Sequence, residues 1–172
     1  QMDTNDACFE FKNGKLILVD GIVGYDYKYD ERGNEIECTP LGLDGNVAYN
    51  RLVVRYAYDE NDNVYSKSYY SDGLPDENLY NIHKTVYKYN TRNEVVEERH
   101  YGKNGHLTLA SYSNAAICRY EYNDKGENVK RAYFGTDERP CRYSEGWSSA
   151  TYEYDVFGNV IKQCFYGVDG NP

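Results

Sequence analysis

The chain has 172 residues, a formal net charge of −9 and 21 tyrosines, and this length is enough for one domain with a core of its own. The negative charge argues against nucleic acid or an anionic membrane surface as the main partner. No apolar run approaches the roughly 20 residues that span a bilayer, so we expect no membrane insertion.

Near the N-terminus, two short apolar or alternating runs flank Asn13-Gly14, which is a strong signal for a β-hairpin. The first run carries Phe9 and Phe11 at alternate positions, and the second ends at Val19. Residues 1–24 therefore resemble a shortened terminal unit, which we expect to cap one end of the fold.

Five copies of a tyrosine-rich motif follow, each with two tyrosines one residue apart and then an Asp or Asn. The second tyrosines are spaced 29, 31, 33 and 32 residues apart, and a fixed period of this length is typical of repeat proteins. We call the Asp or Asn the turn opener and count positions from it. The motif tyrosines and their openers are Tyr27, Tyr29 and Asp30; Tyr56, Tyr58 and Asp59; Tyr87, Tyr89 and Asn90; Tyr120, Tyr122 and Asn123; and Tyr152, Tyr154 and Asp155.

The residues before each opener alternate in character. In the second copy Val54, Tyr56 and Tyr58 share one face, while Arg55 falls on the other. This period of two predicts a strand with one buried face, and we expect the motif tyrosines on that face to be core residues. Position three after each opener holds a residue that tolerates a positive φ, as the tip of a tight hairpin requires. These tip residues are Gly33, Asp62, Asn93, Gly126 and Gly158.

After each tip a return strand carries apolar or aromatic residues at positions six and eleven, such as Ile36 and Leu41 in the first copy. A regular strand would place these two positions on opposite faces, because they differ by an odd number. Either a β-bulge lies between them or both faces are covered, and we favour the bulge. Charged residues of the return strands are expected to keep the outer surface soluble. They include Lys67, Glu98, Arg131 and Lys162.

A second turn, often Asp-Gly or Asn-Gly, follows each return strand, and a further tyrosine then recurs at positions 49, 80, 112 and 143. The whole pattern predicts an all-β fold, in which tandem β-hairpin repeats stack into an elongated, coiled antiparallel sheet similar to a β-solenoid. We expect a single domain over residues 1–172, with the capping hairpin at 1–24 and five repeats of about 31 residues at 25–172. The last repeat is expected to be incomplete, with more repeats or another domain after it.

The pattern Tyr-x-Tyr-Asp-x-x-Gly-Asn resembles the tyrosine–aspartate (YD) repeats of the RHS and teneurin proteins, over residues 25–172. It fits best in the first and fifth copies, whereas the third and fourth have Asn90 and Asn123 as openers, and the third has Asn93 at its tip. The period is longer than in those families, which makes the chain similar to tyrosine-rich repeats of exported bacterial proteins. The resemblance implies a β scaffold without a catalytic site, in a secreted or cell-surface bacterial protein. A chain that opens on Gln1 rather than Met fits either a mature, processed protein or a shortened chain.

Motifs of catalysis and metal binding are absent from the sequence. It contains no HExxH, G-x-S-x-G, P-loop or GxGxxG pattern, so we expect neither enzyme activity nor a cofactor. His100 stands at position ten, where other copies have Tyr69 or Phe165, so we interpret it as a variant of a packing position. Each turn offers a single Asp, which more often bonds its own backbone than calcium. The five cysteines form no CxxC pair, so neither a zinc site nor a complete disulfide framework is expected, while one or two bridges stay open.

Exposed aromatic residues are the remaining functional candidates, because rings can stack on sugars or anchor a protein partner. The residues between hairpins are the best placed, since the strand alternation does not assign them to a buried face. These binding candidates are Tyr80, Tyr112, Tyr143 and especially Trp147, which equally suits a plug over the sheet edge.

The leading hypothesis is a non-enzymatic module that binds a glycan or a protein. The alternative is a purely structural spacer or shell segment of a larger toxin-like or adhesive chain, and a remote third is an enzyme with its site in a loop. A continuous exposed aromatic stripe favours the first hypothesis, and its absence favours the second. The sequence leaves the ligand and the oligomeric state open.

Overall fold

The computed structural model describes residues 9–12, 15–18, 22–42, 45–48 and 51–172, and in these ranges the chain is all-β. None of these ranges forms a helix, and so none holds one long and apolar enough to cross a membrane. The strands are β1 (Phe9–Lys12), β2 (Lys15–Leu18), β3 (Gly24–Tyr29), β4 (Glu35–Leu41), β5 (Val53–Tyr58), β6 (Val64–Ser71), β7 (Leu74–Pro75), β8 (Lys84–Tyr89), β9 (Val95–Tyr101), β10 (Ile117–Tyr122), β11 (Asn128–Phe134), β12 (Ser149–Tyr154) and β13 (Val160–Tyr166).

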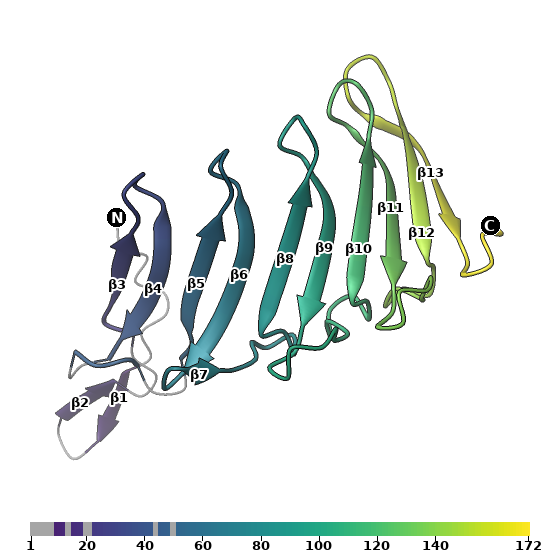
Figure 1. The fold of residues 1–172 in the computed structure, drawn as a ribbon. Coiled ribbons are helices and arrows are strands. Elements are labelled where there is room, and N and C mark those ends of the chain that lie inside the picture. Colours follow the sequence, from purple (N-terminus) through teal and green to yellow (C-terminus); the bar gives the residue numbers. More distant parts are fainter. Residues whose placement is uncertain (1–8, 13–14, 19–21, 43–44, 49–50) are drawn as a thin grey trace.

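The main sheet is antiparallel, has 11 strands and is open at both ends. Its order is β13-β12-β11-β10-β9-β8-β6-β5-β4-β3, with the short β7 paired to β6. Figure 1 shows five hairpins standing side by side in one layer, with their tight tips at one end and the longer connecting loops at the other. The predicted all-β class and the antiparallel sheet of hairpins are confirmed.

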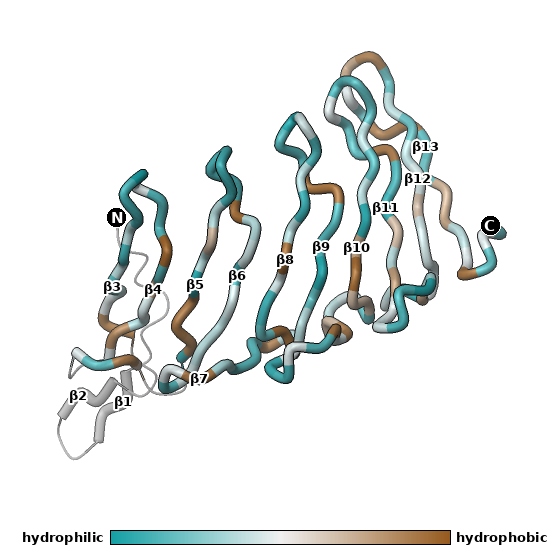
Figure 2. The backbone as a smooth tube through the Cα atoms, viewed as in Figure 1, coloured by the Kyte–Doolittle hydropathy of each residue, from teal (hydrophilic) through white to brown (hydrophobic). Residues whose placement is uncertain are grey.

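The hydrophobic residues are distributed over all the hairpins and do not form one continuous core. Figure 2 shows hydrophobic residues in short segments of each hairpin, separated by hydrophilic ones, and the tips of the first three hairpins are largely hydrophilic. The most deeply buried residues of the described ranges lie near the loop end of the fourth hairpin, where Ala115, Ile117 and Ala150 are fully covered. Burial is therefore concentrated where the connecting loops fold back on the sheet.

The N-terminal hairpin forms where the sequence predicts it, with Phe9 opposite Leu18 and Phe11 opposite Leu16. Its predicted turn at Asn13-Gly14 lies outside the described residues. The two strands make a separate sheet, and among the described strands β3 pairs with β4 alone. Strands β1 and β2 therefore do not cap the main sheet by pairing with it.

The hairpin tips are organised by the side chain of the turn opener. Asp30 accepts hydrogen bonds through Oδ1 from the backbone N–H groups of Arg32 (2.9 Å) and Asn34 (2.8 Å). Position three has a positive φ in all five tips, as predicted, and two of these residues are Asp62 (61°) and Asn93 (60°). An Asx-type turn followed by a left-handed residue reverses the chain in four residues, which fits the copies with Asn openers as well.

Position four of each tip completes an amide–carboxylate pair with the opener, which the turn pattern did not predict. Asn34 Nδ2 donates to Asp30 Oδ2 at 3.2 Å, whereas Asn90 Nδ2 donates to Glu94 Oε2 at 2.6 Å. Where the opener changes from Asp to Asn, position four changes from Asn to Glu, so every tip keeps one carboxylate and one amide. The five pairs are Asp30–Asn34, Asp59–Asn63, Asn90–Glu94, Asn123–Glu127 and Asp155–Asn159.

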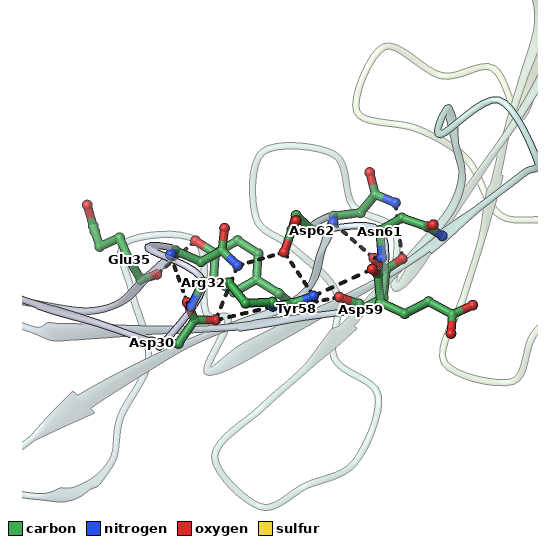
Figure 3. Close-up of polar contacts among 10 residues, drawn as sticks. Asp30, Arg32, Glu35, Tyr58, Asp59, Asn61 and Asp62 are labelled. Carbon is green, nitrogen blue, oxygen red and sulfur yellow. Dashed lines mark hydrogen bonds and ion pairs between the residues drawn. The ribbon is translucent and has the colours of Figure 1, made fainter.

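Neighbouring tips are also bonded to each other (Figure 3). Arg32 donates to the backbone oxygen of Asp59 at 2.9 Å and forms an ion pair with the Asp62 carboxylate at 2.9 Å. Asn34 Nδ2 adds a hydrogen bond to Asp62 Oδ1 at 2.8 Å. The first two hairpins are thereby held in a defined lateral position at their tips.

Each return strand has a β-bulge, but it lies at position six itself rather than between positions six and eleven as predicted. Lys28 lies opposite Glu37 and Tyr29 lies opposite Glu35, so Ile36 has no cross-strand partner. A bulge of this kind twists the strand and disrupts the ladder locally. The residues left unpaired at the five bulges are Ile36, Tyr65, Val96, Val129 and Ile161.

The bulge creates the acceptor that joins one hairpin to the next. The second motif tyrosine donates its hydroxyl to the backbone oxygen at position five of the preceding hairpin, beside that bulge. These bonds are Tyr58 to Glu35 (2.8 Å), Tyr89 to Val64 (2.8 Å), Tyr122 to Val95 (2.9 Å) and Tyr154 to Asn128 (2.7 Å).

Candidate functional site

The two faces of the sheet differ in chemistry. Alternation along β10 sends Tyr120 and Tyr122 to one face, which we call the tyrosine face, and Arg119 and Glu121 to the other, which we call the charged face. The same division applies to the other four hairpins because their registers are equivalent.

The charged face is held by ion pairs across the strands. Glu97 is 7 % exposed and pairs with Arg99 (2.8 Å), Arg119 (2.8 Å) and Lys88 (3.0 Å). Burial by itself would raise the pKa of Glu97, but the hydrogen bonds from these three cations outweigh it and lower the pKa to about 2. These groups satisfy one another, so this face is a structural surface rather than a reactive one.

The motif tyrosines are half-buried rather than core residues. Tyr27 and Tyr29 are 44 % and 59 % exposed in the first hairpin, because a single-layer sheet has no second layer to cover them. Our expectation of a tyrosine core is therefore wrong for these rings. The motif tyrosines are covered in part by neighbouring side chains of the same face and by the connecting loops.

Three of the charged residues that we expected on the outer surface lie among the tyrosines instead. Lys67 Nζ sits 5.6 Å from the ring centre of Tyr56, and the Arg131 guanidinium sits 5.5 Å from that of Tyr120. Glu98 accepts a hydrogen bond from the Tyr120 hydroxyl at 3.2 Å, and burial raises the pKa of the Glu98 carboxyl. Position eight of the return strand shares a face with the motif tyrosines because the bulge shifts the alternation by one residue. Lys162, at position seven, is exposed on the charged face.

Trp147 and Tyr143 pack together at the loop end of the fourth hairpin. Tyr143 stacks on Tyr133 with ring centres 4.5 Å apart, and Trp147 contacts Tyr143 at 4.8 Å and Phe165 at 5.1 Å. Tyr133 is 4 % exposed and belongs to the core cluster with Cys118. The half-buried Trp147 thus acts as the plug that the sequence allowed, with part of its ring still open to a ligand.

Tyr80 and Tyr112 form the second aromatic pair, one repeat away. Their ring centres are 5.1 Å apart in an edge-to-face arrangement, and they are 48 % and 44 % exposed. Next to this pair, His100 is only 1 % exposed and lies between Thr85 Oγ1 and the Tyr112 hydroxyl, each at 3.2 Å. His100 therefore occupies the packing position that its place in the repeat predicted.

The loops that carry these pairs are bonded side by side. The Ser111 N–H donates to the Tyr80 oxygen at 3.0 Å, and the Ser144 N–H donates to the Ser113 oxygen at 3.1 Å. The structure thus brings the four predicted binding residues into two pairs along one loop edge, on the tyrosine face. The earlier tyrosine of this series, at position 49, lies outside the described residues.

A groove at the loop end of the second hairpin was not predicted from the sequence. It encloses about 400 Å³ between Val54 and Tyr69 of the sheet and the loop from Asp76 to Leu79. Tyr69 is the counterpart of Tyr133, which Tyr143 and Trp147 cover in the fourth hairpin. In the second hairpin the loop tyrosine, Tyr80, turns to Tyr112 instead and leaves this groove open. The missed signal was the absence of a second aromatic residue from residues 71–83.

The groove combines an aromatic wall with polar and apolar rims. Arg51, Ser71, Asp76 and Glu77 line it, and Glu77 Oε1 accepts a hydrogen bond from the backbone N–H of Lys103 at 3.0 Å. Leu79 stands at the rim and is 93 % exposed, so it adds an apolar edge that is open to solvent. Charged and hydroxyl groups beside a tyrosine ring suit a polar ligand that has one apolar face, such as a sugar.

The part of the chain that the structure describes offers few residues for redox chemistry or metal binding. Cys38, Cys118, Cys141 and Cys164 are free thiols, and burial raises the pKa of Cys118 to about 12. No group of three His, Cys, Asp or Glu side chains in the described ranges is placed to hold a metal ion. The buried thiol is therefore protonated at neutral pH and is a poor nucleophile.

Comparison with protein families and with curated proteins finds no family model and no curated protein that matches this chain. The likeness to tyrosine–aspartate repeats is accordingly carried by the residues of the motif alone.

Proposed function

We propose that the protein is a non-enzymatic repeat module of an exported, surface-associated bacterial protein, and that the loop edge of its tyrosine face binds an extended glycan. The proposed localisation rests on the resemblance of the motif to YD and related tyrosine-rich repeats. In this proposal the five hairpins form one solenoid-like repeat array, because they share their turn openers, bulges and inter-hairpin bonds.

The observation that carries the proposal is the row of aromatic positions along the loop edge. It runs from the groove at Tyr69 through Tyr80 and Tyr112 to Tyr143 and Trp147. Equivalent backbone positions lie two strands apart, about 10 Å. The rings gather into two clusters, because Tyr80 and Tyr112 approach within 5.1 Å and Tyr143 and Trp147 within 4.8 Å. The edge therefore offers separate aromatic platforms, each of which suits one sugar ring of an extended glycan.

A purely structural spacer is the second candidate, and the inter-hairpin bonds favour it. Hydroxyl bonds such as Tyr122 to Val95 make each junction a defined one, which is what a rigid scaffold needs. In this case the aromatic pairs serve only to cover the loop ends.

Thermal unfolding against a panel of soluble glycans and cell-wall fragments tests the proposal, because a ligand that binds only the folded state must raise the midpoint. We expect one sugar class to raise it, and Tyr69→Ala or Trp147→Ala to reduce the shift. The matched control is Tyr29→Ala, which removes an exposed tyrosine far from the loop edge. A flat panel would contradict glycan binding and leave the spacer or a protein partner as the remaining candidates.

The single tryptophan makes the location of the ligand measurable. A ligand on the Tyr143–Trp147 pair should change the Trp147 emission directly. A ligand confined to the groove at Tyr69 should shift the unfolding midpoint while the emission stays constant.

A further inference from the structure

The last and first strands of the main sheet each pair on one side only. β13 pairs with β12, and β3 pairs with β4, among the strands that the structure describes. An edge strand with open N–H and C=O groups is a template for another strand. The four junctions between hairpins show how such an edge is occupied in this protein.

All four junctions use the same register. Position seven of a return strand lies opposite the residue four places before the next turn opener. The four pairs are Glu37 with Arg55, Ser66 with Val86, Glu97 with Arg119, and Lys130 with Thr151. Position seven of β13 is Lys162, and four places before the first opener, in β3, stands Asp26.

The charges at this pairing are complementary. At the first junction Glu37 lies between two cations, with Lys28 of its own hairpin at 2.6 Å and Arg55 of the next at 2.7 Å. On β13 the signs are reversed, because Lys162 forms an ion pair with Glu153 of its own hairpin at 2.6 Å. Asp26 from a following strand would complete the same three-charge arrangement with opposite signs.

The tyrosine face is complementary at this pairing as well. Tyr29 is 59 % exposed and belongs to the one hairpin of the main sheet with no preceding bulge to receive its hydroxyl. Val160 is position five of the last hairpin, so its carbonyl is the counterpart of the acceptor oxygens at the four junctions. Val160, Ile161 and Phe165 are 51 %, 64 % and 43 % exposed. The tyrosine rings of the first hairpin, which would cover these residues in the pairing, are exposed as well.

We propose that β13 of one copy of the 172-residue chain pairs with β3 of a second copy, in the register of the internal junctions and in the place that a following repeat of a longer chain would take. The contact is head-to-tail, so it continues the sheet and leaves a free β13 on the second copy for a third. A lysine on an edge strand also discourages pairing, which is the rival explanation of Lys162. The two explanations differ in what reversal of its charge should do.

Variants with reversed charges, measured alone and as a mixture, distinguish strand pairing from edge protection by Lys162. Lys162→Asp places Asp opposite Asp26, and Asp26→Lys places Lys opposite Lys162, so each variant alone should associate about tenfold more weakly than the unmodified chain. An equimolar mixture restores an opposite-charge pair between Lys162 and Asp26 of unlike copies and should regain the association. Sedimentation velocity at near-physiological salt measures this, since the net charge of −9 on each copy must be screened.

A disulfide reports the register directly. Position nine lies opposite the residue six before the next opener, as Arg99 lies opposite Ile117, so Cys164 should face Gly24 of the second copy. A Cβ at Gly24 meets no atom within 4 Å, so Gly24→Cys should fold. Mild oxidation should give covalent dimers linked between residues 24 and 164, and the control Gly24→Cys with Cys164→Ser should not.

Two results would overturn the proposal. One is an unmodified chain that stays monomeric up to about millimolar concentration, which would assign β13 to some other strand or to none. The other is association that is unchanged in both charge variants, or strengthened by Lys162→Asp, which would show a different contact or an edge-protecting role for Lys162.

Discussion

The hydroxyl of Tyr122 donates a 2.9 Å hydrogen bond to the backbone oxygen of Val95, which belongs to the preceding hairpin and lies next to its bulge. The bond explains why the second aromatic residue of the motif is tyrosine rather than phenylalanine. The bulge leaves a carbonyl beside an interrupted ladder, and only a ring with a hydroxyl can reach and satisfy it.

Replacement of Tyr122 by Phe should lower the free energy of unfolding by about 1 kcal/mol, because the Val95 oxygen loses its partner while the ring stays in place. Tyr29→Phe is the matched control at protein concentrations where the chain is monomeric, since no earlier hairpin of the main sheet then stands beside β3. Urea unfolding of both variants measures the difference. Equal losses in the two would contradict a role for the inter-hairpin bond.

The amide–carboxylate pair at each tip should behave as a unit. In the fourth tip Asn123 Nδ2 donates to Glu127 Oε2 at 2.7 Å, so Asn123→Asp would set two carboxylates against each other. We expect this change to cost about 1–2 kcal/mol at neutral pH, measured by urea unfolding. Adding Glu127→Asn recreates the Asp30–Asn34 arrangement and should recover most of the loss, whereas purely additive effects in the double variant would argue against coupling.

Burial of His100 should make stability depend on pH. Burial lowers its pKa from 6.5 to about 4, so the unfolded chain takes up the proton at a higher pH than the folded one. The free energy of unfolding should therefore fall as the pH drops from about 6.5 to about 4, by up to about 3 kcal/mol, and this contribution should level off below that range.

The variant His100→Phe isolates this contribution, because the ring cannot titrate and Phe165 fills the equivalent position in the last hairpin. The unmodified protein should lose more stability than His100→Phe between about pH 7 and about pH 4.5. Parallel pH profiles for the two proteins would show that His100 does not titrate in this range.

The positive φ at the tips should make glycine replacements costly. Gly33 has a φ of 87°, and a methyl group added to its Cα would meet no atom within 4 Å, so space does not limit the substitution. Gly33→Ala should therefore cost about 1–2 kcal/mol through backbone strain alone. Gly24→Ala has the same free space without a positive φ, and thermal unfolding should show little change or a small gain in stability.

The sequence predicted the features that depend on residues close together in the chain. Period-two alternation predicted the hairpin strands, and the Asp or Asn openers predicted turns that bond their own backbone, as Asp30 does. The positive φ at Gly33 and its counterparts followed from position counting, which also predicted a bulge in each return strand but placed it after position six rather than at it. These features rest on local sterics and hydrogen bonds within four or five residues, so the order of residues is enough to predict them.

The tertiary structure alone decided how the copies meet and which surfaces stay open. The acceptor of the Tyr122 hydroxyl, the shift of Glu98 onto the tyrosine face, and the open groove at Tyr69 depend on lateral register and loop path. The sequence placed Trp147 and Tyr143 only in a loop between hairpins, whereas their packing against Tyr133 came from that path. Contacts between residues about 30 positions apart are set by how whole hairpins align, and no local pattern of residues encodes that alignment.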